Sequence, residues 1–119
     1  MPSGGPIRSH STETSSTMWS GPSAETRLRD APARTVRKAY AWVDPEGDPE
    51  SKGSYKFIHH EVRSGGAVGP ANVRACRSGI GVLNGARGGA KVPAADRKGI
   101  YNHLARHLRD AGEEPAPLK

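Results

Sequence analysis

The sequence predicts an α+β fold in which a small β-hairpin packs on a C-terminal two-helix hairpin, preceded by an extended N-terminal arm. Three observations predict it. Apolar residues recur at helical steps in two runs between residues 69 and 112, residues 54–62 alternate like a strand, and the first 22 residues are rich in Ser, Thr, Gly and Pro. We therefore divide the chain into an arm at 1–36, a compact domain at 37–112 and a tail at 113–119.

The arm has few side chains able to form a core. Among its first 22 residues only Ile7, Met18 and Trp19 are large and apolar. So little apolar surface does not offset the entropy lost on ordering the segment. We expect a disordered tail or, as the sharper alternative, an arm that orders across a partner with Trp19 as its anchor. Ser23 is suited to cap a short helix that Pro32 would interrupt.

The hairpin is predicted from two stretches. Aromatic and β-branched residues favour a strand over 39–44, although Val36, Tyr40 and Val43 also keep helical spacing. Residues 54–62, SYKFIHHEV, alternate between two faces and form the second strand. An antiparallel pair joined by the loop between them follows.

That loop carries alternating acidic residues, which resemble the opening of a calcium-binding loop. Counted from Asp44, however, the twelfth position is Tyr55, where such a loop needs an acidic residue. We interpret the stretch as a solvated turn.

The two C-terminal helices follow from apolar spacing. One face carries Val73, Cys76, Ile80 and Leu83, and the other carries Ile100, Tyr101, Leu104, Ala105 and Leu108. The glycines at 85–89 predict the connection rather than a phosphate-binding loop. Pro70 and Pro93 suit first helical turns, Asp96 suits a helix N-terminus, and Gly112 suits the position just past a helix end.

Charge and cysteine content narrow the class of protein. Eighteen Lys and Arg residues against twelve Asp and Glu give a net charge of +6, which favours an anionic partner. The single cysteine, Cys76, excludes an intrachain disulfide framework, and its place on a predicted apolar face indicates a buried thiol. No apolar run approaches a membrane span and no signal-peptide core follows Met1, so we expect a soluble protein made in a reducing cytoplasm.

Four histidines form the candidate metal site. His59 and His60 lie on the predicted strand, and His103 and His107 lie four apart on one helix face. Two helical histidines and a strand histidine can together bind zinc. The glutamate that follows the first helical histidine in metalloproteases is replaced here by Leu104. The alternative, which the sequence alone favours, is that each imidazole packs beside the core, so we expect no cofactor.

Basic residues form the candidate partner surface. With the aromatic anchor, the residues assigned to it are Trp19, Arg27, Arg74, Arg77, Arg106 and Arg109. They could follow a phosphate backbone, but the connection at 85–92 is longer than a helix-turn-helix turn, and a solvated face is the favoured interpretation. No Ser/His/Asp or Cys/His arrangement has supporting spacing, so we expect no enzyme.

The chain also resembles a known family in four blocks. These are WSGPSAE at 19–25, RKAYAWVDPEGDPESKGSYKFIHHEV at 37–62, ANVRACRSGIGVLNGARGG at 71–89 and IYNHLARHLRDAGEEPAPLK at 100–119. Together they resemble a small domain of tailed-phage and prophage head-gene regions, found attached to prohead (head maturation) proteases and as a stand-alone chain. Nothing here matches the catalytic residues of the protease, so no catalytic role is carried over.

The resemblance implies a place in the phage virion. We expect a decoration or minor capsid protein, made in the host cytoplasm, that binds the major capsid protein on a symmetric lattice and no membrane. A nucleic-acid-binding accessory protein of head assembly ranks second. A small zinc-binding module ranks third, and an enzyme last.

Overall fold

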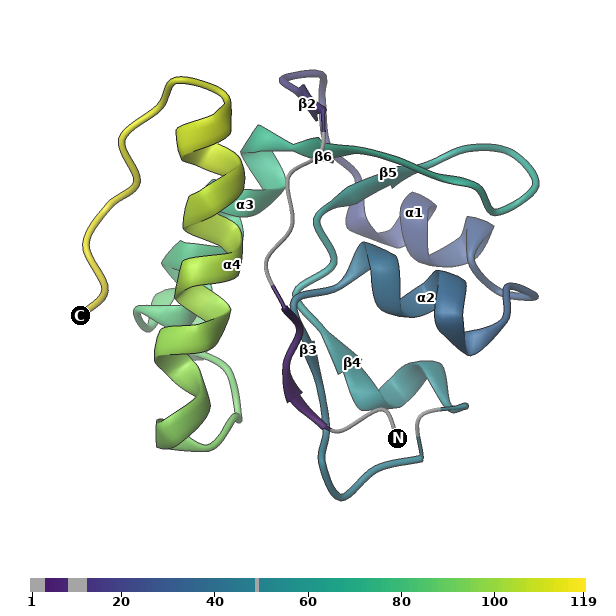
Figure 1. Ribbon diagram of the computed structural model, residues 1–119, viewed down its shortest axis with the longest axis horizontal. Coiled ribbons are helices and arrows are strands. Elements are labelled where there is room, and N and C mark those ends of the chain that lie inside the picture. The colour runs from purple at the N-terminus through teal and green to yellow at the C-terminus, as the bar shows by residue number, and fades with distance from the viewer. Residues whose placement is uncertain (1–3, 9–12, 49) are drawn as a thin grey trace.

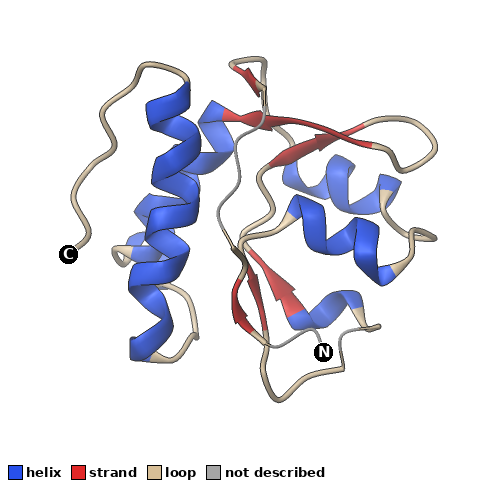
Figure 2. Ribbon diagram, viewed as in Figure 1, coloured by secondary structure: helices blue, strands red, loops and turns tan. Residues whose placement is uncertain are grey.

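The computed structural model describes residues 4–8, 13–48 and 50–119. Over these residues the chain is an α+β fold with two three-stranded sheets and four α-helices (Figures 1 and 2). The elements are, in order, β1 (Gly5–Pro6), β2 (Thr14–Ser15), α1 (Gly21–Arg27), α2 (Ala33–Ala39), β3 (Trp42–Val43), η1 (Lys52–Ser54), β4 (Tyr55–Lys56), β5 (His60–Val62), β6 (Val68–Asn72), α3 (Val73–Leu83), η2 (Ala86–Gly88), η3 (Ala94–Asp96) and α4 (Arg97–Asp110).

The predicted hairpin is present in a shorter form. β3 pairs antiparallel with β4, and β1 pairs antiparallel with the other edge of β3. The second sheet has the order β2-β6-β5, in which β2 runs parallel to β6. Of the strand predicted over 39–44 only Trp42–Val43 forms a strand, because Ala39 ends α2 and the extended Tyr40 is its C-cap. The helical spacing of Val36, Tyr40 and Val43 therefore reflects a real helix only as far as Ala39, since Val43 lies on β3.

The strand predicted over 54–62 is wrong as a single element. Phe57 has a φ of 67°, in the left-handed region that residues with a Cβ adopt only under strain. The chain turns there, leaves the first sheet after β4 and enters the second sheet as β5. After the turn the backbone of His59 donates to the carbonyl of Ala39 at 2.9 Å and accepts from the amide of Asn72 at 2.7 Å. Period-two alternation does not reveal such a turn, because side-chain patterns say nothing of the sign of φ.

The C-terminal helix pair is confirmed. α3 and α4 pack together (Figure 1). Their apolar faces form the first core cluster with Ala41 and Trp42 of the hairpin segment. α3 is capped by Asn72, whose side-chain Oδ1 accepts from the amide of Ala75 at 3.1 Å. The prediction that Pro70 lies in the first turn of this helix is wrong, because Pro70 belongs to β6. Gly112 follows the end of α4 with a φ of 80°, as expected of that position.

The extended N-terminal arm is the second correction. Within 1–36 the structure places β1, β2, α1 and most of α2. α1 is capped by Ser20, whose hydroxyl accepts from the amide of Ser23. The two short helices cover β5 and β6 (Figure 1) and bury apolar residues in a second core cluster, which contains Ile7, Ala24, Leu28, Val36, Ala39, Tyr40, Val43, Tyr55 and Val62. The composition argument failed because the few apolar residues of the arm share this core with residues from 39–62, so the arm does not need a core of its own.

The tail at 113–119 runs back beside the helix pair (Figure 1). Leu118 packs against the first core cluster, and the hydroxyl of Tyr101 donates to the carbonyl of Ala116 at 2.8 Å. Across the described part of the chain, the helices are too short or too polar to cross a membrane.

Candidate metal centre

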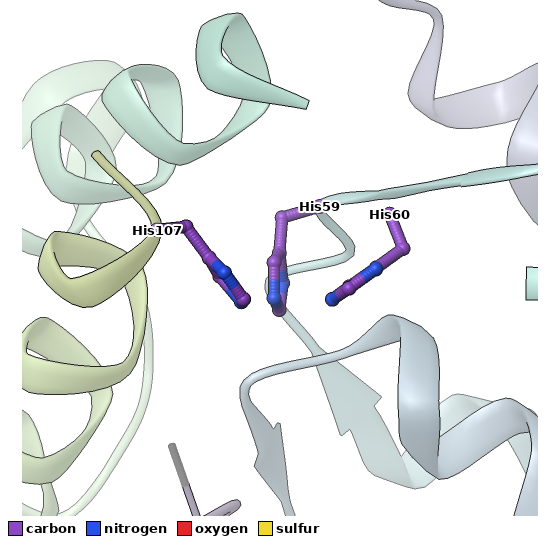
Figure 3. Close-up of side chains that lie close together, drawn as sticks. All are labelled: His59, His60 and His107. Atoms are coloured by element: carbon purple, nitrogen blue, oxygen red, sulfur yellow. The ribbon is translucent and has the colours of Figure 1, made fainter. Parts of the chain in front are cut away.

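Four histidines from two distant parts of the sequence meet between the helix pair and the sheets. His59 and His60 lie where the chain enters β5, and His103 and His107 lie one turn apart on α4. Their side chains are 0%, 1%, 0% and 0% exposed, respectively. Figure 3 shows the imidazoles of His59, His60 and His107 lying next to one another, with His59 in the middle. Isolated core histidines would not gather in this way.

The backbone fixes which ring nitrogen faces the cluster. Nδ1 of His59 lies 2.9 Å from the carbonyl of Phe57, and Nδ1 of His60 lies 2.9 Å from the carbonyl of Gly69. A carbonyl only accepts hydrogen bonds, so each Nδ1 carries the proton and donates. In a neutral imidazole the Nε2 atom then has a lone pair, which is the form that binds a metal. Metal-binding histidines are commonly oriented by a second hydrogen bond of this kind.

His103 repeats the arrangement from the helix. Its Nδ1 lies 2.7 Å from the carbonyl of Ile7, next to β1, and therefore donates to it. Its Nε2 lies 3.1 Å from Nε2 of His59. Two neutral rings in these tautomers would point lone pairs at each other, so this contact needs a cation or a second proton on one ring. Ligands about 2.0–2.1 Å from a tetrahedral zinc are themselves separated by about 3.3 Å, close to the observed spacing.

A second proton on His59 is disfavoured. Burial lowers the pKa of the His59 imidazole well below its ordinary value of 6.5, and the positive forms of His60, His103 and His107 would lower the pKa further. The hydrogen bond to the Phe57 carbonyl acts in the opposite direction and is outweighed. Near neutral pH the ring is therefore neutral and available as a ligand.

The distances within the cluster suit one ion after a small contraction. Candidate ligand atoms of His59, His60 and His107 lie within 4.8 Å of one another. The ring centroids of His59 and His60 are 4.6 Å apart, and those of His60 and His107 are 5.1 Å apart. Since tetrahedral ligands are about 3.3 Å apart, an ion would draw the three rings inward by side-chain rotation.

The donor set indicates which metal would bind. Neutral imidazoles suit zinc, copper, nickel and iron, whereas calcium and magnesium prefer oxygen ligands. Cys76 belongs to the first core cluster, as the sequence predicted, and burial followed by the charge of Glu113 raises the pKa of its thiol to about 12. At neutral pH it is a protonated, apolar-like side chain and not a thiolate ligand.

The residues assigned to a partner surface have other neighbours. Trp19 is half-buried against the second core cluster. Nη1 of Arg27 donates to the carbonyl of Val62 at 2.9 Å, and Nε of Arg74 donates to that of Ser16 at 3.1 Å.

Two more of these arginines form ion pairs near the C-terminus. Arg77 pairs with Glu113 at 2.7 Å, and Arg106 lies 3.9 Å from Asp110. Arg109 is exposed on α4.

The acidic loop forms local turns. Oδ1 of Asp44 accepts from the amide of Glu46, and Oδ1 of Asp48 accepts from that of Glu50, each at 2.9 Å. These Asx-turns agree with a solvated turn. Pro49 in this loop lies outside the described residues.

Sequence reasoning missed the three backbone carbonyls that orient the imidazoles. It paired His103 with His107 correctly, but the folding of His59 and His60 onto that face depends on the turn at Phe57. The signal in the sequence that could have indicated this site is the adjacent pair His59 and His60. No family model, curated protein or solved structure matches this chain.

Proposed function

We propose that this chain is a small structural module whose fold is stabilised by one transition-metal ion, with zinc as the best candidate. His59, His60 and His107 would bind the ion, and His103 would complete a four-imidazole set. The observation that supports this most directly is the Nε2–Nε2 distance of 3.1 Å between His59 and His103, whose Nδ1 atoms both donate to carbonyls. A cation between the rings gives both lone pairs a partner.

Burial favours a structural over a catalytic role. Catalytic zinc keeps one position for water or substrate, whereas structural zinc is closed by four protein ligands. Here all four imidazoles are at most 1% exposed. The expectation that the chain is not an enzyme stays a prediction.

The buried charge of the ion also needs compensation, because imidazoles are neutral ligands. The carbonyls of Ile7, Phe57 and Gly69 accept from the rings and so place partial negative charge around the cluster. Such outer hydrogen bonds raise the basicity of the rings and typically contribute about 10- to 100-fold to metal affinity.

Metal analysis of the purified protein tests the proposal. We expect one zinc per chain after dialysis, and cobalt substitution should give the intense visible bands of a tetrahedral ion. His107→Ala and His59→Ala should each weaken binding by more than about 100-fold, beyond the loss from an outer contact. Asn102→Ala is the matched control, since Asn102 is exposed on α4 beside His103.

A second measurement covers variants that fail to fold. Zinc at about 100 times its dissociation constant should stabilise the wild-type protein by about 2.7 kcal/mol, which raises the melting temperature by several degrees, and a chelator should reverse the shift. A wild-type protein that binds neither zinc nor cobalt stoichiometrically, and whose melting temperature ignores both, would contradict the proposal.

We also propose that the module works in the head of a tailed phage, as a decoration or minor capsid protein. The resemblance in four sequence blocks supports this role, and the net charge of +6 suits an acidic shell surface. Met18 adds a contact point, because its side chain is 86% exposed next to the half-buried Trp19. Mass spectrometry of purified particles should find the chain in fixed ratio to the major capsid protein, and its absence would contradict this role.

Nucleic-acid binding remains the weaker alternative. Arg77 and Arg106 already contact carboxylates of the same chain, which reduces the charge that they offer to phosphates. The alternative predicts a mobility shift at low salt that disappears steeply as salt is added.

A further inference from the structure

A second site lies beside the histidine cluster, on the side of α2. It is an open pocket of about 510 Å³, and the described residues that line it are Ile7, Arg34, Arg37, Lys38, His60, Val68 and Gly69. Pockets of about 300–1,000 Å³ are of the size that holds small organic ligands.

The charged side chains among the described residues that line the pocket are all positive. Arg34, Arg37 and Lys38 lie at positions i, i+3 and i+4 of α2, so they share one face of that helix. None of the described residues that line the pocket carries a carboxylate. Three positive side chains around one depression attract an anion, and the apolar wall strengthens that field by excluding water.

The rest of the lining is largely apolar. Ile7 is 7% exposed, and Val68 packs against the second core cluster. The Gly69 carbonyl and Nδ1 of His60 already bind each other, so they offer little to a ligand. A ligand that fits would have an anionic head for α2 and an apolar body for Ile7 and Val68.

Another pocket of similar size lacks this complementarity. It has a volume of about 490 Å³ and an aromatic wall, but its lining mixes Glu25 with Lys56 and Lys91. Charges of both signs do not select one class of ligand.

We propose that the pocket between α2 and the start of β6 binds a small organic carboxylate that carries an apolar group. The guanidinium forks of Arg34 and Arg37 match a carboxylate with paired hydrogen bonds, and Lys38 adds a point charge. The apolar group covers Ile7 and Val68. The residues proposed to contact the ligand are Arg34, Arg37, Lys38, Ile7 and Val68, and none of them is a candidate metal ligand.

NMR titration of the full chain with benzoate tests this proposal. Benzoate should shift the amide signals of Val68, Gly69 and α2 in a saturable way, in both the zinc-loaded and the metal-free protein. Benzamide has the same ring without the charge, and should bind at least about ten-fold more weakly, the loss expected for one charge-assisted contact. Inorganic phosphate, which has the charge without the ring, should also bind more weakly than benzoate.

Variants locate the site. The double variant Arg34→Ala/Arg37→Ala should weaken benzoate binding by at least about ten-fold, whereas Arg106→Ala/Arg109→Ala on α4 should leave it unchanged. If the first variant fails to fold, Lys38→Glu changes an exposed side chain and should weaken binding in the same assay.

Three results would overturn the proposal: no saturable shift with benzoate, benzamide binding as tightly as benzoate, or phosphate binding as tightly as benzoate. Because both metal states are titrated, a failure here is distinguishable from a failure of the zinc site.

Discussion

The indole of Trp42 and the carboxylate of Asp96 are joined by a hydrogen bond of 2.9 Å, from Nε1 to Oδ2. Trp42 lies on β3 and is 2% exposed, while Asp96 occupies the N-cap position of α4. One bond thus attaches the first sheet to the start of the helix that carries His103 and His107.

Trp42→Phe should therefore destabilise the protein more than its loss of volume suggests. It removes a hydrogen bond to a charged group, which is worth about 1.5–3 kcal/mol, and leaves the Asp96 carboxylate without that donor. Chemical denaturation followed by circular dichroism measures the change. Trp19→Phe is the matched control, since Trp19 is only half-buried, and it should cost less. Equal losses for the two variants would show that the bond contributes little.

Gly99→Ala should be destabilising although it lies in a helix. A Cβ at this position would lie 2.6 Å from both Cβ and Cγ of Pro6, so β1 would have to move away from α4. The control is Gly81→Ala in α3, where the nearest atom, Cβ of Ala86, would be at an ordinary 3.9 Å.

The two substitutions gain the same helix propensity, about 1 kcal/mol, so Gly81→Ala should raise the melting temperature and Gly99→Ala should lower it. The melting temperatures of both variants, measured by thermal unfolding, test this prediction. A stabilising Gly99→Ala would mean that β1 does not pack on α4.

Cys76 should react very slowly with thiol reagents in the native protein. Burial raises the pKa of its thiol to about 12 from 9.0, which leaves roughly a thousand-fold less thiolate than in the unfolded chain. Labelling then requires opening of the helix pair. Zinc should slow labelling of the native protein, because it binds only the closed form, and should not slow labelling of the denatured protein. Rapid native labelling would contradict the packing of α3 on α4.

Stability should fall at alkaline pH because of Tyr40. Burial, and then the charge of Glu25, raises the pKa of Tyr40 from 10.0 to about 12. Below the unfolded pKa both states keep the phenol proton and stability does not depend on it. Between those two values only the unfolded chain loses the proton, so the free energy of unfolding decreases. Tyr40→Phe should flatten this decline, as measured by urea denaturation of the metal-free protein across that range. An unchanged slope would show that Tyr40 is solvated.

The helix pair and the C-terminal end of α4 were predictable because they depend on local rules. Apolar spacing placed Cys76 and Ile80 on one buried face, and Gly112 marked the end of α4 through its need for a positive φ. The spacing of His103 and His107 likewise placed them on one helix face.

The rest depended on tertiary contacts. The turn at Phe57 is imposed on a residue that does not prefer it, so no local rule signals it. Leu28 and Val36 belong to the segment predicted as an extended arm, and only tertiary contacts make them core residues. The contact between His59 and His103 depends on these tertiary contacts, since the whole fold brings β5 and α4 together.

The position of the histidines along the chain has one more consequence. An ion held by His60 and His107 would tie together two points separated by on the order of fifty residues, and such a tie stabilises mainly by restricting the unfolded chain. With a single cysteine, this chain has no internal disulfide to serve as that cross-link. A coordinated ion would be a reversible cross-link. It would form or be lost as the concentration of available metal changes, without any redox chemistry.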